Sequence, residues 1–127
     1  MALLLDTHTF LWFVANDILL PISIKNKIKN INEPCFMSVA SLWEIVIKMR
    51  IGKLILNLTL SELFEYVERN RIEILQIEFE HLSELSKLPM HHSDPFDRLI
   101  ISQAISEKMI LITKDSKMKK YNVSVEW

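Results

Sequence analysis

The chain has very little glycine and cysteine, and each shortage excludes a class of site. Its 127 residues include one glycine, Gly52, and one cysteine, Cys35. Phosphate-binding loops of the Walker and Rossmann kinds need several glycines where the backbone approaches the nucleotide, so no nucleotide cofactor is expected. A single cysteine allows neither an internal disulfide nor a metal site built from cysteines.

Long hydrophobic runs and an excess of basic residues are also missing. No run of about eighteen apolar residues occurs, so neither a transmembrane helix nor a membrane partner is expected. The first residues, MALLLDTHTFLWF, carry no basic charge and are interrupted by Asp6, unlike a signal peptide, so a cytoplasmic protein is expected. The formal net charge of −1 gives no overall basic surface for nucleic acid. A nuclease that gathers carboxylates would, however, lower its own net charge.

Short apolar runs alternate with amphipathic helical stretches, which is the pattern of βαβ units and a parallel sheet. Expected strands are 2–6, 35–39, 72–77, 109–113 and 123–127; expected helices are 7–15, 21–30, 41–50, 59–70, 78–88 and 95–108. No repeat or linker interrupts the series, so residues 1–127 are expected to form a single domain. Right-handed crossovers favour a three-layer α/β/α sandwich with about five parallel strands in the order 3-2-1-4-5.

Four acidic residues fall near the carboxyl ends of the expected strands, where parallel sheets bind their ligands. Asp6 ends the first strand and Asp115 follows the fourth, whereas Glu44 and Asp97 lie in the helices after the second and before the fourth strand. Carboxylates that converge repel one another unless cations neutralise them, and Mg²⁺ prefers such oxygen ligands. Two such ions about 3.5–4 Å apart can activate a water and stabilise the leaving oxygen in phosphodiester cleavage.

Three of the acids also have a simpler interpretation. Asp6 could cap a helix, although Thr7 is available for that role. Glu44 could pair with Lys48 four residues later, but its mostly apolar neighbours favour a polar pocket. Asp115 could be an ordinary turn residue. Any one of these interpretations is acceptable. A shared site is favoured because all of them would have to hold at the same edge of one sheet.

The segment MHHSDPFDR contains two aspartates with different expected roles. Asp94 is best explained as a helix N-cap, with Pro95 as the first helical residue, which leaves Asp97 as the better metal ligand. The neighbouring histidines raise a zinc site as an alternative, but adjacent histidines generally point apart. Zinc is therefore not favoured, and no role is assigned to His8, His91 or His92.

Basic residues surround the acids. They would suit a polyanionic RNA backbone bound through its phosphates, although ordinary solubilising charge explains each lysine taken singly. The candidate phosphate contacts are Lys48, Arg98, Lys114 and Lys117.

Four segments occur in the order and spacing of PIN-domain nucleases: LLLDTHTFLW, SVASLWEIVIKMRIGKL, LPMHHSDPFDRLIISQA and LITKDSKM. Over nearly its whole length the chain most resembles the VapC-type toxins of bacterial type II toxin–antitoxin pairs. The resemblance implies a PIN-like fold and an endoribonuclease that depends on Mg²⁺ or Mn²⁺. It also implies a homodimer that a cognate antitoxin protein neutralises.

The resemblance places the acidic quartet of metal ligands at Asp6, Glu44, Asp97 and Asp115, with Thr113 in support. Many members carry a further Asp or Asn shortly after the fourth acid, where this chain has Ser116 and Lys117. The implied reaction is hydrolysis of an RNA phosphodiester by a metal-activated water. Asp6, Asp97 and Asp115 would hold the principal metal, and Glu44 would complete its shell or orient the water.

Two other functions remain open for the same fold. One is a nuclease directed at DNA, since nothing in the sequence reads a 2′-hydroxyl. The other is a non-catalytic PIN-like module that binds RNA or a protein, which the four acids disfavour because a scaffold needs no repelling carboxylates.

Overall fold

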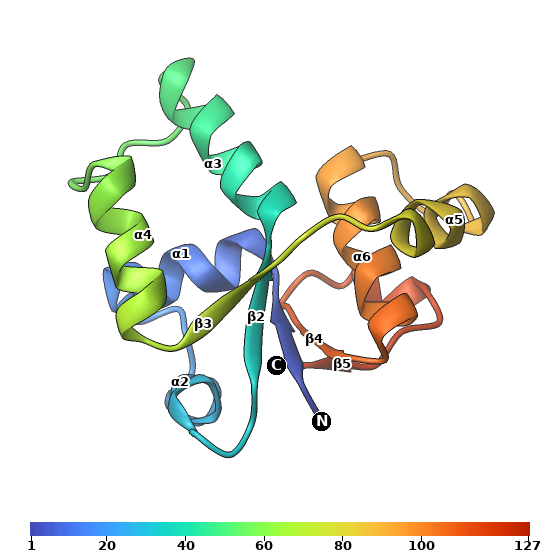
Figure 1. The fold of residues 1–127 in the computed structure, drawn as a ribbon, viewed down its shortest axis with the longest axis horizontal. Helices are drawn as coiled ribbons and strands as arrows, with labels where there is room; N and C mark the ends of the chain where they lie inside the picture. The colour runs from blue at the N-terminus through green and yellow to red at the C-terminus, as the bar shows by residue number, and fades with distance from the viewer.

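The computed structural model describes residues 1–127 and contains one five-stranded sheet with helices on both sides (Figure 1). The strands are β1 (Leu3–Leu5), β2 (Cys35–Ser38), β3 (Ile72–Leu75), β4 (Ile110–Ile112) and β5 (Val125–Glu126). The helices are α1 (Thr7–Ala15), α2 (Ile22–Lys29), α3 (Val39–Arg50), α4 (Leu60–Arg69), α5 (Phe79–Lys87) and α6 (Pro95–Glu107), with a short 3-10 helix at Met118–Lys120. None of these helices has the length and hydrophobicity needed to cross a membrane.

The strand order is β3-β2-β1-β4-β5, and every neighbouring pair is parallel. This confirms the predicted order and fold class. The central strand β1 is covered on both faces, because successive side chains of a strand point to opposite sides. Leu3 and Leu5 pack in a cluster with α1, α2, α3 and α4, whereas Leu4 packs in a second cluster with α6. Figure 1 shows α1 to α4 on one side of the sheet and α5 and α6 on the other.

Two strands pass directly into helices at the same edge of the sheet. After β1, the Asp6 carboxylate accepts a hydrogen bond from the Thr9 backbone N–H at 2.8 Å and caps α1. After β2, the Ser38 hydroxyl accepts from the Ala40 N–H at 3.0 Å and caps α3. The sequence left both Asp6 and Thr7 as possible caps of α1, and the cap is Asp6. One prediction needs correction here, because α3 begins at Val39 rather than at residue 41.

Helix α6 begins at this edge and returns the chain to the start of β4. Its N-cap is Asp94, whose Oδ1 accepts from the Asp97 N–H at 2.9 Å, and Pro95 opens the helix as predicted. Helix α5 packs against α6, and its only buried residue is His81. The His81 ring accepts from the Glu78 N–H at 3.0 Å and bonds the Glu107 carboxylate at 2.8 Å, so it ties the two helices together.

Gly52 ends α3 as the sequence predicts. It lies just past the last helical turn with a φ of 73°, in the left-handed region, and its N–H donates to the Met49 carbonyl at 3.2 Å. Glycine adopts this conformation without the steric cost that other residues meet.

The substitution Leu4→Ala is expected to lower the free energy of unfolding by about 2–5 kcal/mol, because it opens a cavity between the central strand and α6. Urea denaturation measures the change. Ile18→Ala is the control, since that side chain is 96% exposed, and its effect should stay within about 0.5 kcal/mol. Equal losses in the two variants would contradict the placement of Leu4 in the core.

Candidate active site

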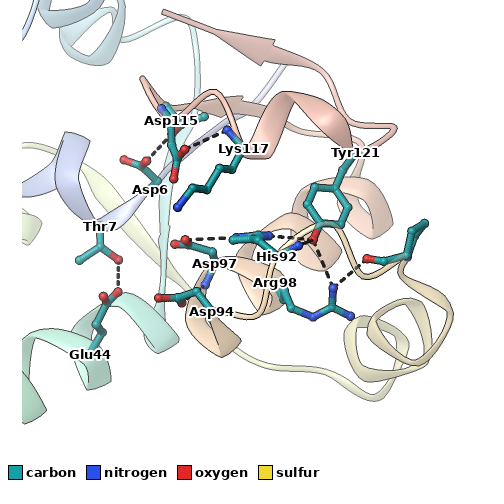
Figure 2. Close-up of polar contacts among 12 residues, drawn as sticks. Asp6, Thr7, Glu44, His92, Asp94, Asp97, Arg98, Asp115, Lys117 and Tyr121 are labelled. Atoms are coloured by element: carbon teal, nitrogen blue, oxygen red, sulfur yellow. Dashed lines mark hydrogen bonds and ion pairs between the residues drawn. The ribbon is translucent and has the colours of Figure 1, made fainter.

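The four predicted acids lie around the carboxyl edge of the sheet. Asp6 leaves β1, Asp115 follows β4, Glu44 projects from α3, and Asp97 lies in the first turn of α6. Figure 2 shows their carboxylates turned toward a common space, with Asp94 beside Asp97. The topology therefore brings together residues as far apart in the sequence as Asp6 and Asp115, which are separated by 109 positions.

Asp6 is the most deeply buried of the aspartates, with 4% of its surface exposed. Burial raises the pKa of its carboxyl above the ordinary value, because the charged form loses hydration. Hydrogen bonds from the Thr113 hydroxyl and from Thr9 act in the opposite direction. Asp6 is thus held by two donors and carries a charge that its surroundings compensate incompletely.

Glu44 is buried, and each of its carboxylate oxygens has a partner. The Thr7 hydroxyl donates to Oε1 at 2.7 Å, and the Lys48 ammonium donates to Oε2 at 2.7 Å. Thr7 lies 3.0 Å from the Ser41 hydroxyl as well. The pairing with Lys48 and the inward orientation of Glu44 therefore occur together, although the sequence presented them as alternatives. Thr7 was missed as a site residue; its position directly after Asp6 is the signal that could have found it.

Asp97, like Asp6, has a carboxyl pKa above its ordinary value. Burial, and then the negative charges of Asp94 and Glu44, raise the pKa of its carboxyl to about 6, whereas His92 opposes the rise. The His92 ring nitrogen Nε2 lies 3.4 Å from Asp97 Oδ2. The sequence left His92 without a role, and its location five residues before Asp97 gave no sign that the two side chains meet.

Asp115 is joined to Asp6 through one hydroxyl group. Thr113 donates to Asp6 Oδ2 and accepts from the Asp115 N–H at 3.0 Å. Asp115 Oδ1 in turn accepts from the Lys117 N–H at 2.9 Å. Asp6 and Asp115 line a cavity of about 380 Å³, whose other lining residues are His8, Trp12 and Lys114.

A family model for the PIN domain matches residues 3–123. The chain belongs to the PIN-domain family. Among solved structures its fold is similar to VapBC2 from Rickettsia felis bound to a DNA fragment from their promoter, at 20% identity and a TM-score of 0.75 over 99% of this chain and 98% of the matched one.

Two further VapBC structures are similar over 99% of this chain and 97% of theirs: DNA-bound VapBC from Salmonella typhimurium, at 17% identity and a TM-score of 0.73, and VapBC-1 from nontypeable Haemophilus influenzae, at 19% and 0.71. No curated protein matches the sequence.

The basic residues around this PIN-domain site divide into two groups. Arg98 is only 9% exposed and its guanidinium donates to the backbone carbonyls of Leu88 and Pro89, so its predicted contact with RNA phosphate is corrected to a role inside the protein. Lys48 is engaged by Glu44. Lys114 and Lys117 are exposed, and Figure 2 shows the Lys117 side chain pointing toward the carboxylates.

The donor set suits a hard divalent cation. Burial raises the pKa values of Asp6 and Asp97, and repulsion from Asp94 and Glu44 adds to the rise at Asp97; a nearby cation would favour the ionised forms of both acids. No three His, Cys, Asp or Glu side chains lie close enough together in this conformation to surround one ion. Mg²⁺ commonly takes one or two carboxylates and keeps several waters, whereas Zn²⁺ needs three or four protein ligands. The carboxylates therefore fit Mg²⁺ better than Zn²⁺.

The raised pKa of Asp97 predicts how the stability of the metal-free protein depends on pH. Its carboxyl titrates at about 6 in the folded chain against an ordinary value of 3.8, so the folded state holds this proton more tightly. Its contribution to stability is full below the lower value and is lost as the pH rises through the higher one. Above about pH 6, ionised Asp97 destabilises the fold.

Asp97→Asn should therefore raise the free energy of unfolding at about pH 7.5 and change it little near about pH 3.5. Partial exposure of Asp97 screens the charge, which limits the gain to the order of 1 kcal/mol. Urea titrations at the two pH values measure it, with Glu80→Gln on the exposed surface of α5 as the control. A variant no more stable than wild type at the higher pH would refute the assignment.

Proposed function

We propose that this PIN-domain protein is a VapC-type toxin, an endoribonuclease that depends on a divalent metal ion. The observation that carries the proposal is the convergence of Asp6, Glu44, Asp97 and Asp115 at the carboxyl edge of a PIN-domain sheet. The similarity of nearly the whole chain to proteins from VapBC complexes supports the toxin assignment.

The carboxylates would hold Mg²⁺ or Mn²⁺, with Asp6, Asp97 and Asp115 as principal ligands, directly or through bound water, and Glu44 completing the shell or orienting a water. When bound, the ion supplies positive charge opposite the phosphate and favours ionisation of a water. Lys114 lines the cavity with Asp6 and Asp115, and Lys117 points toward the carboxylates (Figure 2). Both side chains are exposed and would attract the phosphates of the RNA backbone.

The residues around the carboxylates act by fixing their orientation. Thr113 holds Asp6 through its hydroxyl and Asp115 through the backbone. Thr7 and Lys48 hold the two oxygens of Glu44. Because every one of these partners is buried or anchored on a helix or strand end, the acids keep their directions before substrate arrives, which lowers the cost of ordering them for the reaction.

Nuclease activity is tested with purified protein, labelled RNA and the matching DNA, each with Mg²⁺, with Mn²⁺ and with a chelator. Asp6→Asn and Asp97→Asn are expected to lower RNA cleavage by about 100-fold or more, because each removes a charged metal ligand while preserving shape. Asp17→Asn, at the end of α1, is the matched control.

Circular dichroism establishes that the three variants remain folded. Full cleavage by both site variants, or cleavage unaffected by the chelator, would refute the metal-nuclease proposal. Cleavage of DNA alone would favour the DNA-directed alternative, and metal-independent RNA binding without cleavage would favour the binding module.

We also propose that the cognate antitoxin packs into an apolar groove between α3 and α4. The groove has a volume of about 590 Å³, and its lining includes Trp43, 59% exposed, and Phe64, 46% exposed. Exposed apolar surface of this extent marks interaction sites, and the similar structures are VapBC complexes. Helix α3 carries Glu44 as well, so a partner in the groove would touch a helix of the active site.

The cognate antitoxin is the protein whose co-expression rescues growth. Phe64→Ser should weaken its binding by at least about tenfold, since buried aromatic side chains dominate the energy of interfaces. Calorimetry with the purified pair measures this, and Ile31→Ser, exposed at a distant loop, is the control. Unchanged affinity for Phe64→Ser would exclude the groove. If that variant instead dissociates a homodimer in size-exclusion chromatography, the groove is the dimer interface.

A further inference from the structure

The two histidines of the MHHSDPFDR segment have different surroundings in the structure. His91 is exposed, and its ring makes only an edge-to-face contact with Tyr121, at 4.8 Å between centroids. His92 lies between two polar groups: Nδ1 is 2.8 Å from the Tyr121 hydroxyl, and Nε2 is 3.4 Å from Asp97 Oδ2. His92 therefore bridges the candidate metal ligand to a residue of the core (Figure 2).

The other hydrogen bonds of the Tyr121 hydroxyl decide whether it donates to His92 or accepts from it. Its hydroxyl oxygen receives the His92 backbone N–H at 3.2 Å and the Arg98 Nη1–H at 3.2 Å. A phenol has one proton to donate and two lone pairs that accept, and neither of these two partners can accept a proton. The Tyr121 proton is thus left for His92 Nδ1.

A neutral imidazole that accepts at Nδ1 carries its proton at Nε2. That proton faces Asp97 Oδ2, so the chain of hydrogen bonds runs from Arg98 to Tyr121, then to His92, and ends at Asp97.

Arg98 is a firm starting point for this chain. Its buried guanidinium is also bonded to the carbonyls of Leu88, at 3.2 Å, and Pro89, at 2.8 Å, and a guanidinium can only donate hydrogen bonds. Tyr121 is 4% exposed and packs in the second core cluster, so the phenol cannot turn away without opening the core. Both ends of the His92 ring are therefore constrained by groups that have fixed places in the fold.

We propose that His92 is a positioning residue for Asp97: Arg98 and Tyr121 hold it as the Nε2–H tautomer, and it donates to Oδ2 so that Oδ1 is presented to a divalent cation. This inference rests on the proposed function, because it assigns Asp97 to a metal ion. No hydrogen bond within the chain occupies Asp97 Oδ1, whereas the Asp94 cap and α6 fix the Asp97 backbone. Groups that orient a ligand in this way typically change metal affinity by about 10–100-fold.

The first test reads the tautomer directly, by ¹⁵N NMR of the histidine rings in the full-length metal-free protein. The resonances of His92 are identified by their loss in His92→Gln. The expected spectrum shows a protonated Nε2 and an unprotonated Nδ1, and Tyr121→Phe should abolish this preference because it removes the donor to Nδ1. A wild-type spectrum with the proton on Nδ1 would overturn the inference.

The second test measures Mn²⁺ affinity by calorimetry, with the metal alone as the probe. His92→Ala should weaken binding by about 10–100-fold. His92→Gln should restore most of the loss, because its amide N–H can reach the position of Nε2. His91→Ala is the matched control and should bind as wild type does. Thermal unfolding followed by circular dichroism verifies that each variant is folded.

The outcomes separate this inference from the proposed function. Wild-type protein that binds no Mn²⁺ overturns the proposed function, and the role of His92 toward a metal falls with it. Wild-type binding with unchanged affinity in His92→Ala overturns the inference alone. Loss in both His92→Ala and His92→Gln would assign His92 a packing role and would also overturn it.

Discussion

The parallel register between β1 and β4 is the constraint on which the site depends. Leu5 pairs with Ile112, so the next residues, Asp6 and Thr113, leave the sheet side by side. The Asp6 N–H donates to the Ile112 carbonyl at 3.1 Å, and the Thr113 hydroxyl donates back to the Asp6 carboxylate. A slip of one residue would turn the side chains of β1 to the opposite faces. It would bury Asp6 against the wrong layer and separate the two partners.

Gathering carboxylates at one edge costs free energy, and the protein offsets this cost unevenly. The Glu44 carboxylate forms an ion pair with the Lys48 ammonium, at 2.7 Å. The Asp6 carboxylate accepts hydrogen bonds only from neutral donors, Thr9 and Thr113. The contact between His92 Nε2 and Asp97 Oδ2 is the longest hydrogen bond in the site, at 3.4 Å. The pKa values of Asp6 and Asp97 are raised accordingly. Asp6 and Asp97 are therefore the two acids whose negative charge is least compensated, and a divalent cation beside them would stabilise the site most.

Helix α6 is both part of the hydrophobic core and the element that carries Asp97 at the carboxyl edge of the sheet. Its start is set by the Asp94 cap and Pro95, and its apolar residues bury it against the sheet. That burial also draws Arg98 into the core, where it fastens the loop before the helix and, through Tyr121, the ring of His92. One packed helix thus places Asp97 and restrains the side chain that faces it, so the site inherits the rigidity of the core.

The sequence by itself determined the order of helices and strands, the strand order of the sheet, the Asp94 cap and the location of the four acids around the carboxyl edge of the sheet. These features follow from local periodicity, from capping chemistry and from topological rules that need no side-chain partner. It did not determine the partners of the acids. Thr7 bonds Glu44 across 37 positions, and His92 bonds Tyr121 across 29.

Arg98 illustrates the physical reason for that division. An arginine that follows an acid at the start of a helix has the same local pattern whether its guanidinium faces solvent or the core. Only the path of the loop, which brings the Leu88 and Pro89 carbonyls within reach, decides that it is buried. Long-range hydrogen bonding, which depends on the packed tertiary structure, therefore settled the roles that local sequence left open.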